Sequence, residues 1–451
     1  MERLGPVDAM FLELEKSGPP VAVGAVSEIP GKAPDIDAVR DFVAGRLDGM
    51  PRFRQRVEAS RSKVRAMKWV DVDPDLTHHV RVMHSGGSLD EAVSELMELP
   101  MDSDKPLWDL TVLTGYAPDR WAFVIRLHHA IADGQGALIL IGHLIDMTPD
   151  GGFTLADAVA SMARGDDEPD SDVPDRSGRV AAFADKTGRS VDMVFQLLGD
   201  FIATYPDTMR ALGDMMPRRR SELTGQVSGS RTWVSGHYPL PDVKTARKGY
   251  KGATINDLVL AAVAIGFTTL LESRGEDPAG RTLRAVMPVS LRRNMKANNQ
   301  VGLLPAPLPL GEMPAAERIR QIRLATKRSK RSKLPLITDE IAKATAKVTP
   351  APIMDAVVGG SGGATAFVAE TLVTNVPGPK MPLYFMGYEV ANQTPVIPIE
   401  GALRIIVGIT SYADELNIGI TGDGEHATDV DVLLGGIQAG FASILAESTQ
   451  S

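Results

Sequence analysis

The sequence predicts an α/β fold made of two units of mixed strands and helices. Strand-like and helix-like segments alternate along the chain, which is typical of layered α/β or α+β proteins. A chain of 451 residues is long enough for two or three domains of about 150 residues, or for one large two-lobed fold. Each half also contains a strand-like segment, a polar loop and an apolar helix, which suggests two copies of one α/β unit.

The N-terminal part contains the clearest strand–loop–helix pattern. Trp121–Leu127 is continuously apolar except for one Arg and predicts a buried strand. A polar loop follows, and Ala137–Met147 predicts a helix. We extend this first unit over residues 1–163.

A change in composition separates the two halves. Arg164–Arg179 is dense in Asp, Pro, Ser and Gly, which predicts an exposed linker. Val191–Met216 predicts a helical connector. We therefore assign residues 164–228 to the linker and connector, and residues 229–451 to a second unit.

The second unit is predicted to begin with a strand over Arg231–Leu240. Thr254 is a candidate N-cap because Asp257 follows three residues later, and the helix then runs to Leu271. Thr428, with Asp431 three residues on, predicts the cap of a last helix over residues 429–447. Further strands are predicted at Leu283–Val289, Phe367–Val376, Ala402–Tyr412 and Leu416–Thr421.

Composition excludes several classes of function. The chain has 48 Lys and Arg against 57 Asp and Glu, and the net charge of −9 argues against a nucleic-acid binder. It has no cysteine, which excludes a thiolate nucleophile, a Cys-ligated zinc and an iron–sulfur cluster. We expect no metal. The longest apolar run, Leu258–Leu271, is shorter than the ~20 residues of a spanning helix, and no secretory signal is visible.

One motif has the features of a catalytic site. His128 and His129 follow the strand over Trp121–Leu127, and Asp133 and Gly134 precede the next helix. An imidazole at the end of a rigid strand suits proton transfer, because its ordinary pKa is ~6.5. Asp133 is suited to orienting an imidazole or fixing the loop, and Gly134 permits a tight turn. The alternative is a polar pair at a strand end, with Asp133 capping the helix.

The motif resembles the active-site sequence of the chloramphenicol acetyltransferase-like superfamily, HHxxxDG. Other segments, in the same order along nearly the whole chain, resemble the bacterial wax ester synthase/diacylglycerol acyltransferase branch of it. They are Leu4–Phe11 near the start, Pro106-Leu107-Trp108, Asn256-Asp257, Met287–Arg292, Asn298–Gly302, the segment Thr374–Pro379 with Asn375, Pro377 and Gly378, and Leu416–Asp423. On the residues alone, Trp108 predicts a core anchor and Thr374–Pro379 a rigid turn.

The resemblance implies a two-lobed fold with a tunnel between the lobes, entered by acyl-CoA and by an acceptor alcohol. It implies that His129 is the general base and that no covalent acyl-enzyme forms. Asp133 is expected to hold the loop first and to orient the base second. His128 is expected to line the tunnel or to support His129, and Asn256 is the candidate oxyanion donor. The resemblance implies diacylglycerol or a long-chain alcohol as the acceptor, and no cofactor is expected beyond acyl-CoA as co-substrate.

A run of bases without acids lies between Arg318 and Lys333. A solvated helix face is the simplest interpretation, but such a stripe also suits the phosphates of CoA or an anionic membrane. We expect a cytoplasmic protein attached to the inner face of a membrane or to lipid inclusions. The candidate contact residues are Arg318, Arg320, Arg323, Lys327 and Arg328.

Two other functions are compatible with the sequence. The chain could bind lipid on the same fold with negligible turnover, or it could acylate a polyketide, sugar or peptide. Ser361, within Gly359–Gly363, matches the G-x-S-x-G pattern of serine hydrolases. The buried strand that a nucleophile elbow needs is absent from the sequence before it, so a glycine loop is the better interpretation.

Overall fold

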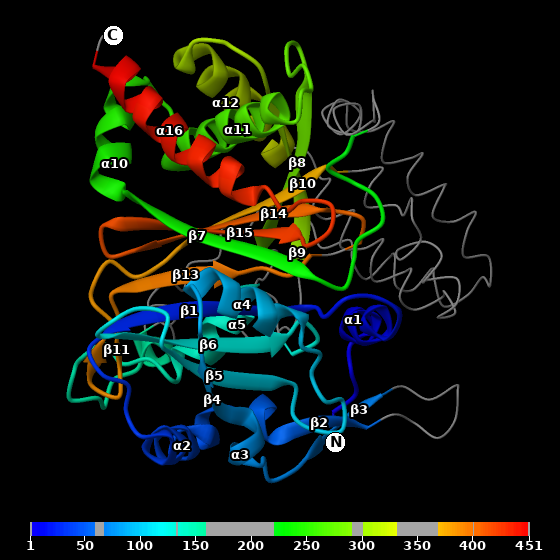
Figure 1. Ribbon diagram of the computed structural model, residues 1–451, viewed down its shortest axis with the longest axis vertical. Helices are drawn as coiled ribbons and strands as arrows, with labels where there is room; N and C mark the ends of the chain where they lie inside the picture. The colour runs from blue at the N-terminus through cyan, green and yellow to red at the C-terminus, as the bar shows by residue number, and fades with distance from the viewer. Residues whose placement is uncertain are drawn as a thin grey trace.

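The chain folds into two lobes, one above the other in Figure 1, each built around its own β-sheet. The computed structural model describes residues 2–58, 67–131, 134–158, 221–290, 301–331, 369–399 and 401–449. The first lobe begins with α1 (Pro6–Ser17), β1 (Ala22–Pro30), α2 (Ile36–Ala44), two short 3-10 helices (Leu47–Gly49 and Pro51–Arg54), β2 (Gln55–Glu58), β3 (Lys68–Asp71), α3 (Leu76–His79), β4 (Val80–His84), α4 (Leu89–Glu98), β5 (Trp108–Thr114), β6 (Arg120–His128) and α5 (Gly134–Gly142).

The second half of the chain contains the rest of the described elements. Most of them form the second lobe, but β11 and β12 pack against the core of the first lobe, and β13 joins the first lobe's sheet. The two large sheets have the strand orders β13-β1-β6-β5-β4 and β7-β15-β14-β10-β8-β9. The elements are β7 (Arg231–Pro239), α10 (Leu240–Gly249), α11 (Ile255–Ser273), β8 (Thr282–Ser290), β9 (Val301–Pro309), α12 (Ala315–Arg331), β10 (Thr371–Pro377), β11 (Tyr384–Phe385), β12 (Tyr388–Glu389), β13 (Asn392–Val396), β14 (Ile405–Tyr412), β15 (Glu415–Asp423) and α16 (Val430–Ser448).

Strand β6 is the centre of the first sheet. It runs antiparallel to β1 on one side and to β5 on the other, with Ala22 opposite His128 and Trp108 opposite Leu127. Every residue of β6 after Arg120 is buried. The predicted strand over Trp121–Leu127 is therefore confirmed, because only a strand covered on both faces tolerates such a continuous apolar run.

The core of the second lobe lies between its sheet and the apolar helices α11 and α16. The predicted cap of α11 is confirmed: the Thr254 hydroxyl accepts from the Asp257 N–H at 3.2 Å, and the Asp257 carboxylate accepts from the Thr254 N–H at 2.8 Å. Helices α11 and α16 approach closely where both have glycine. A Cβ added to Gly266 would lie 2.5 Å from the side chain of Ile437.

Two predicted helix boundaries are wrong. The helix predicted over Ala137–Met147 ends at Gly142, because the chain turns there to bring Asp146 onto Arg46, whose guanidinium donates to both carboxylate oxygens at 2.7 and 2.8 Å. The last helix begins at Val430 rather than at a Thr428 cap. The Asp429 carboxylate makes no cap hydrogen bond and binds Arg274 instead, at 2.6 and 2.8 Å.

The other predicted elements differ in smaller ways. The strand predicted over Arg231–Leu240 ends at Pro239, and those predicted over Phe367–Val376 and Ala402–Tyr412 begin at Thr371 and Ile405. The strands β8 and β15 contain the predicted ranges in full. The predicted linker, the helical connector and Ser361 lie outside the described residues.

The two lobes share strand β13. It comes from the second half of the chain but pairs antiparallel with β1 at the edge of the first sheet, where β13 and β1 lie side by side in Figure 1. Its opposite side packs on β14 and β15, where glycines leave room: a Cβ on Gly419 would lie 2.2 Å from the Pro395 carbonyl oxygen. The predicted boundary at residue 229 stays a prediction, but no single cut separates the two sheets.

Helix α4 forms a second contact between the lobes, lying along the edge strand β7 (Figure 1). The side chains of Asp90, Ser94 and Glu98 accept from the N–H groups of Ser235, Trp233 and Arg231 at 3.3, 2.8 and 2.8 Å. The spacing fits, because four helical residues advance ~6 Å and two strand residues ~6.6 Å. Burial raises the pKa of Asp90, while hydrogen bonds from Ser235 lower it.

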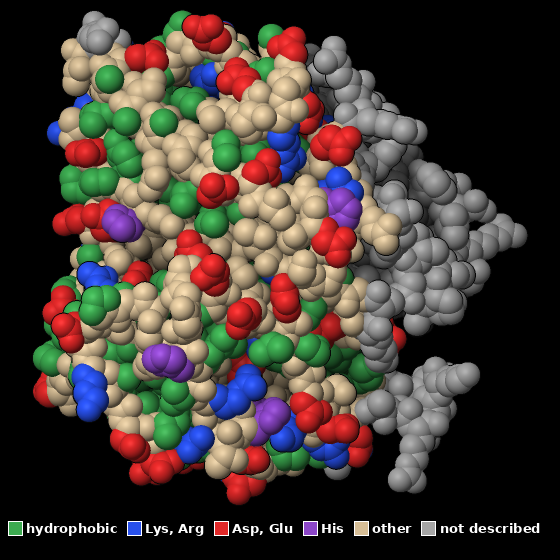
Figure 2. Space-filling model, in the orientation of Figure 1, with side chains coloured by type: hydrophobic (Ala, Val, Ile, Leu, Met, Phe, Trp, Pro, Cys, Tyr) green, Lys and Arg blue, Asp and Glu red, His purple; other side chains and the backbone are tan. Residues whose placement is uncertain are grey.

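Among the described residues, two helices are long and apolar enough to cross a membrane by length and composition alone, α11 and α16. Most of the apolar stretch of α11 is buried in the core of the second lobe, and α16 packs along α11. Figure 2 shows acidic side chains spread over both lobes on the face displayed, in keeping with the net charge of −9.

His79 is a buried histidine in the first core. Its ring lies 4.5 Å from that of Trp108, nearly parallel, and its Nδ1 lies 2.7 Å from the Trp108 carbonyl oxygen, so Nδ1–H donates to that oxygen. Burial lowers the pKa of His79 and outweighs the hydrogen bond to Trp108, which raises it. A lowered folded pKa means that the unfolded chain takes up the proton more readily. The contribution to stability is therefore present above 6.5, the ordinary pKa, and is lost as the pH falls through the lowered value.

We predict that this histidine makes the fold acid-sensitive. The free energy of unfolding of the wild type should fall between pH 7 and pH 5 more steeply than that of His79→Phe, which keeps an aromatic ring beside Trp108. Urea unfolding followed by circular dichroism at pH 8, 7, 6 and 5 measures both curves. Parallel curves over this range would contradict the prediction.

Candidate active site

The predicted histidine motif begins at the last residue of β6. Both histidine N–H groups are fixed by neighbouring strands: that of His128 donates to the Leu107 carbonyl at 3.0 Å and that of His129 to the Val21 carbonyl at 3.1 Å. The Ile131 N–H then donates to the His128 carbonyl at 2.9 Å. This closes a turn with His129 at its second position, so the motif sits on a rigid strand end as predicted.

His128 has a supporting position and cannot be a catalytic base. Its side chain is buried, and both ring nitrogens are occupied. Nδ1 accepts from the Ala130 N–H at 3.0 Å, so the ring proton is on Nε2, which donates to the Glu15 carboxylate at 2.7 Å. These contacts favour the interpretation of His128 as support for His129 over a direct catalytic role, and its place on a tunnel wall stays a prediction.

His129 has the exposure and surroundings that a reactive side chain needs. It is partly exposed, whereas the residues on either side of it are buried. Its ring stacks on Phe11 of α1, with the centroids 4.2 Å apart and the planes 20° from parallel. The stacking fixes the plane of the imidazole against α1.

Asp133, the acid of the motif, lies outside the described residues, so both roles predicted for it stay predictions. Gly134 is the first residue of α5, as the strand–turn–helix pattern predicts. A tunnel past His129 also stays a prediction.

The Pro106-Leu107-Trp108 segment is structural. All three residues are buried, and the Trp108 ring stacks on Phe53 at 4.5 Å while its indole N–H donates to the Phe53 carbonyl at 3.0 Å. This confirms the interpretation of Trp108 as a core anchor. Because Leu107 also supplies the carbonyl that accepts from His128, the segment positions the histidine motif directly.

Asn256 and Asn375, which come from two separate predicted motifs, meet in the second lobe. The Asn375 side-chain N–H donates to the Asn256 side-chain oxygen at 3.0 Å. The Asn256 amide nitrogen lies 3.8 Å from the sulfur of Met287, a weak acceptor. The amide nitrogen of Asn256 can therefore donate elsewhere. The described hydrogen bonds of Asn256 do not reach His129, which stands in the other lobe. Asp257 caps α11, as predicted.

The segment Thr374–Pro379 is only partly a turn. Strand β10 continues to Pro377, which pairs with Ser411, so the prediction of a turn holds only beyond that residue. The Gly378 N–H donates to the Ser411 hydroxyl at 3.1 Å, and a Cβ on Gly378 would lie 2.1 Å from the Ser411 carbonyl oxygen. Glycine is required there by close approach of the backbone.

The basic stretch forms helix α12, and its bases are not equivalent. Arg318 is buried, and its guanidinium donates to the carbonyls of Pro309 and Gly311, so the prediction that it contacts CoA or a membrane is wrong. Arg320, Arg323 and Lys327 are exposed, and Arg328 is partly exposed. Leu324 is 51% exposed among them.

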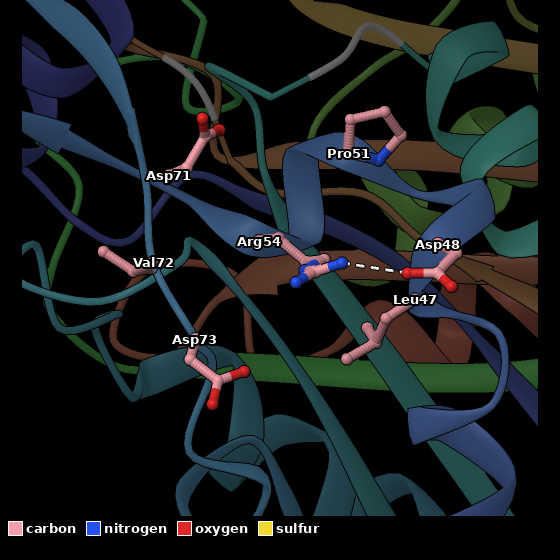
Figure 3. A pocket seen from close by; sticks show the side chains of 7 residues that line it. All are labelled: Leu47, Asp48, Pro51, Arg54, Asp71, Val72 and Asp73. Carbon is pink, nitrogen blue, oxygen red and sulfur yellow. Dashed lines mark hydrogen bonds and ion pairs between the residues drawn. The ribbon is translucent and has the colours of Figure 1, made fainter.

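A surface hollow of about 670 Å³ lies elsewhere in the first lobe (Figure 3). Its polar lining is one arginine among acids, with Arg54 paired to Asp48 at 2.9 Å. It contains none of the predicted site residues, and within the described part of the chain no group of acids and histidines is arranged to hold a metal. The lining residues are Leu47, Asp48, Pro51, Arg54, Asp71, Val72 and Asp73.

Sequence reasoning assigned no role to Glu15, and it marked Phe11 only as part of the segment Leu4–Phe11; both are α1 residues that contact the histidines. Their spacing of four residues places them on one face of the helix, which was the available signal. It also missed Arg126, a buried base in β6 that binds Asp109 at 2.5 and 3.0 Å and the Leu99 carbonyl at the end of α4 at 3.0 Å.

Two mixed sheets in two lobes, with a histidine pair leaving the central strand of one, define the chloramphenicol acetyltransferase-like class of acyltransferase folds. The solved structure of a wax ester synthase/diacylglycerol acyltransferase from Marinobacter aquaeolei VT8 has this fold. It aligns with a TM-score of 0.68 at 23% identity, over 99% of this chain and 100% of that one. The trichothecene 15-O-acetyltransferase TRI3 from Fusarium sporotrichioides aligns with a TM-score of 0.61 at 13% identity, over 98% of this chain and 94% of that one.

The chain belongs to the wax ester synthase/diacylglycerol acyltransferase family. The family's catalytic domain matches residues 4–259, and its C-terminal domain matches residues 297–445. A probable diacylglycerol O-acyltransferase of Mycobacterium tuberculosis is 32% identical, over 99% of this chain and 96% of that protein. The O-acyltransferase WSD of Acinetobacter baylyi is 26% identical, over 93% and 92%.

Proposed function

We propose that the chain is an acyl-CoA-dependent O-acyltransferase that esterifies diacylglycerol, a long-chain alcohol, or both. Membership of the family supports acyl transfer. The observation that carries the site assignment is the partly exposed His129, held at the end of a buried strand by backbone hydrogen bonds and by stacking on Phe11.

The reaction needs one base. His129 takes the proton of the acceptor hydroxyl while that oxygen attacks the thioester carbonyl. The tetrahedral intermediate then collapses, the C–S bond breaks, and the CoA thiolate leaves with the proton returned by His129. No acyl-enzyme is needed, which suits a chain without cysteine. General base catalysis contributes about 10²–10⁴ in rate, so positioning and oxyanion stabilisation supply the rest.

Asn256 is the proposed oxyanion donor, and Asn375 orients it. Because Asn375 donates to the Asn256 oxygen, the Asn256 amide plane is fixed and its N–H₂ group points away from Asn375. A neutral amide can stabilise developing charge without itself taking part in proton transfer. The position at the start of α11 adds the favourable end of the helix dipole.

Contact with a membrane is the proposed route to lipid acceptors, and α12 is the proposed surface. Its exposed Arg320, Arg323 and Lys327 surround the exposed Leu324, a pattern suited to anionic lipid headgroups with one apolar side chain inserted. A cytoplasmic location at the inner face of the membrane or at lipid inclusions follows from this proposal.

Replacing the base tests the function. We expect His129→Ala to lower acyl transfer by at least ~10²-fold, because only the general base is lost. Its melting temperature should stay near that of the wild type, because the backbone hydrogen bonds remain. Thin-layer analysis of products from labelled acyl-CoA with diacylglycerol and with hexadecanol measures transfer. His237→Ala, which removes an exposed histidine of β7, is the control.

The same transfer assay distinguishes an enzyme from a lipid-binding protein with negligible turnover. Release of free CoA that depends on diacylglycerol or alcohol identifies an enzyme, and its absence in the wild type would favour a lipid-binding protein. Full activity in His129→Ala would contradict the mechanism.

Alanine substitutions in the Asn256–Asn375 pair should lower kcat by different amounts. Asn256→Ala should lower kcat by about 10²–10³-fold, the usual cost of losing one oxyanion donor. Asn375→Ala should lower kcat less, because Asn256 is still present but no longer held. Initial rates at varied acyl-CoA give kcat and KM separately. A change in KM alone would show that the pair binds substrate instead.

The helix α12 prediction concerns binding to vesicles. The triple variant Arg320→Glu, Arg323→Glu, Lys327→Glu should bind vesicles containing anionic lipid about 10²-fold more weakly, since each base near such a surface contributes about 1 kcal/mol. The control reverses three exposed bases of α10, as Lys244→Glu, Arg247→Glu, Lys248→Glu. Flotation that is undiminished in the α12 variant, or equally reduced in both, would contradict the assignment.

A further inference from the structure

We propose that Glu15 is a positioning residue for catalysis, which holds His129 in place through His128. This inference rests on the proposed function of His129 and goes beyond it, because it assigns a role to helix α1. Glu15 belongs to no part of the histidine motif and lies more than a hundred residues away from it in the sequence.

The first observation is that one face of α1 contacts both histidines. Phe11 and Glu15 are four residues apart, so their side chains lie one above the other on the helix. Phe11 stacks on His129 with the ring centroids 4.2 Å apart, and Glu15 accepts from His128 at 2.7 Å. Consecutive histidines are therefore held by successive turns of one helix.

The second observation is a continuous path of hydrogen bonds from Glu15 into the turn. The Glu15 carboxylate accepts the Nε2–H of His128, which leaves Nδ1 as the acceptor for the Ala130 N–H at 3.0 Å. Ala130 is the residue directly after His129. If Glu15 did not hold the proton on Nε2, the other tautomer would place N–H against N–H at Ala130 and open the turn.

The third observation is that α1 is itself fixed at both ends. Before it, the Leu4 N–H donates to the Met67 carbonyl and the Trp69 N–H to the Glu2 carbonyl, both at 2.9 Å, which ties the chain to β3. After it, the Val21 carbonyl accepts from the His129 N–H. The helix is thus an anchored brace across the motif rather than a free terminal segment.

The carboxylate is suited to this role in two ways. Its hydrogen bond to an imidazole N–H is charge-assisted, and 15% exposure of the side chain leaves little water to compete. An amide oxygen at the same place can also accept the Nε2–H, whereas a methyl group cannot. A positioning role is therefore separable from a purely structural one by comparing Glu15→Gln with Glu15→Ala.

The test measures kcat, KM and the His128 tautomer in these two variants. We expect Glu15→Ala to lower kcat by about 10–10²-fold with little change in the KM for acyl-CoA, because a slightly misplaced base costs rate rather than binding. Glu15→Gln should restore kcat to within about threefold of the wild type, since its amide oxygen accepts the same proton. Glu95→Ala, which removes an exposed carboxylate of α4, should match the wild type.

Nitrogen-15 NMR of histidine-labelled protein reads the tautomer without any acyl transfer. The wild type and Glu15→Gln should show His128 with its proton on Nε2, and Glu15→Ala should show a mixture of tautomers. This readout keeps the inference testable if the wild type transfers no acyl group, in which case the proposed function fails separately.

Three outcomes would overturn the inference. They are a wild-type kcat in Glu15→Ala, a His128 tautomer that does not change in that variant, and a Glu15→Gln protein that melts like the wild type but keeps less than a tenth of its kcat. If Glu15→Ala does not fold, the kcat and the tautomer of Glu15→Gln decide.

Discussion

The hydrogen bonds that tie two consecutive histidine N–H groups to the strands on either side fix the geometry of the whole site. Strand β6 lies between β1 and β5, and at its end His128 bonds to Leu107 while His129 bonds to Val21. Moving either histidine would break a backbone hydrogen bond to a residue directly before β5 or β1. The buried Trp108 stack holds the β5 side, and α1 holds the β1 side, so the packing of the first lobe converges on this strand end.

The lobes are joined by backbone hydrogen bonds as well as by packing. Strand β13 extends the first sheet with a segment of the second half of the chain, and α4 covers the edge strand β7 of the second sheet with side-chain acceptors. Edge strands otherwise present unpaired N–H groups to solvent or to other chains. Both contacts are repetitive and directional, which favours one relative placement of the lobes.

The sequence predicts those parts of the structure that depend on local patterns. The apolar run of β6, the capping box of Thr254 with Asp257, and the strand-end position of His129 all follow from neighbouring residues. The Thr428 cap predicted for the last helix is wrong: Asp429 stands at the cap position of α16, and its carboxylate binds Arg274, 155 positions away in the sequence. The contact role predicted for Arg318 is wrong because this one base of the charged run turns inward and donates to the carbonyls of Pro309 and Gly311.

Features that depend on contacts between distant segments could not be predicted from the sequence, either at β13 or at the site. Strand β13 has a proline and little apolar alternation, so its strand character comes from pairing with β1. Glu15 and Phe11 are ordinary helix residues until α1 is placed against β6. The pairing of Asn256 with Asn375 also required the fold, although both residues stood in segments already singled out.

The strand exchanged at β13 has a consequence for how the chain can be divided. The two family domains meet between residues 259 and 297, which suggests that each could be produced alone. An N-terminal fragment would lack β13 and expose the edge of β1, and a C-terminal fragment would lack β7 and expose the edge of β15. Neither family domain contains all the strands of a large sheet, so a split or circularly permuted version of this protein must keep residues 392–396 available to pair with β1.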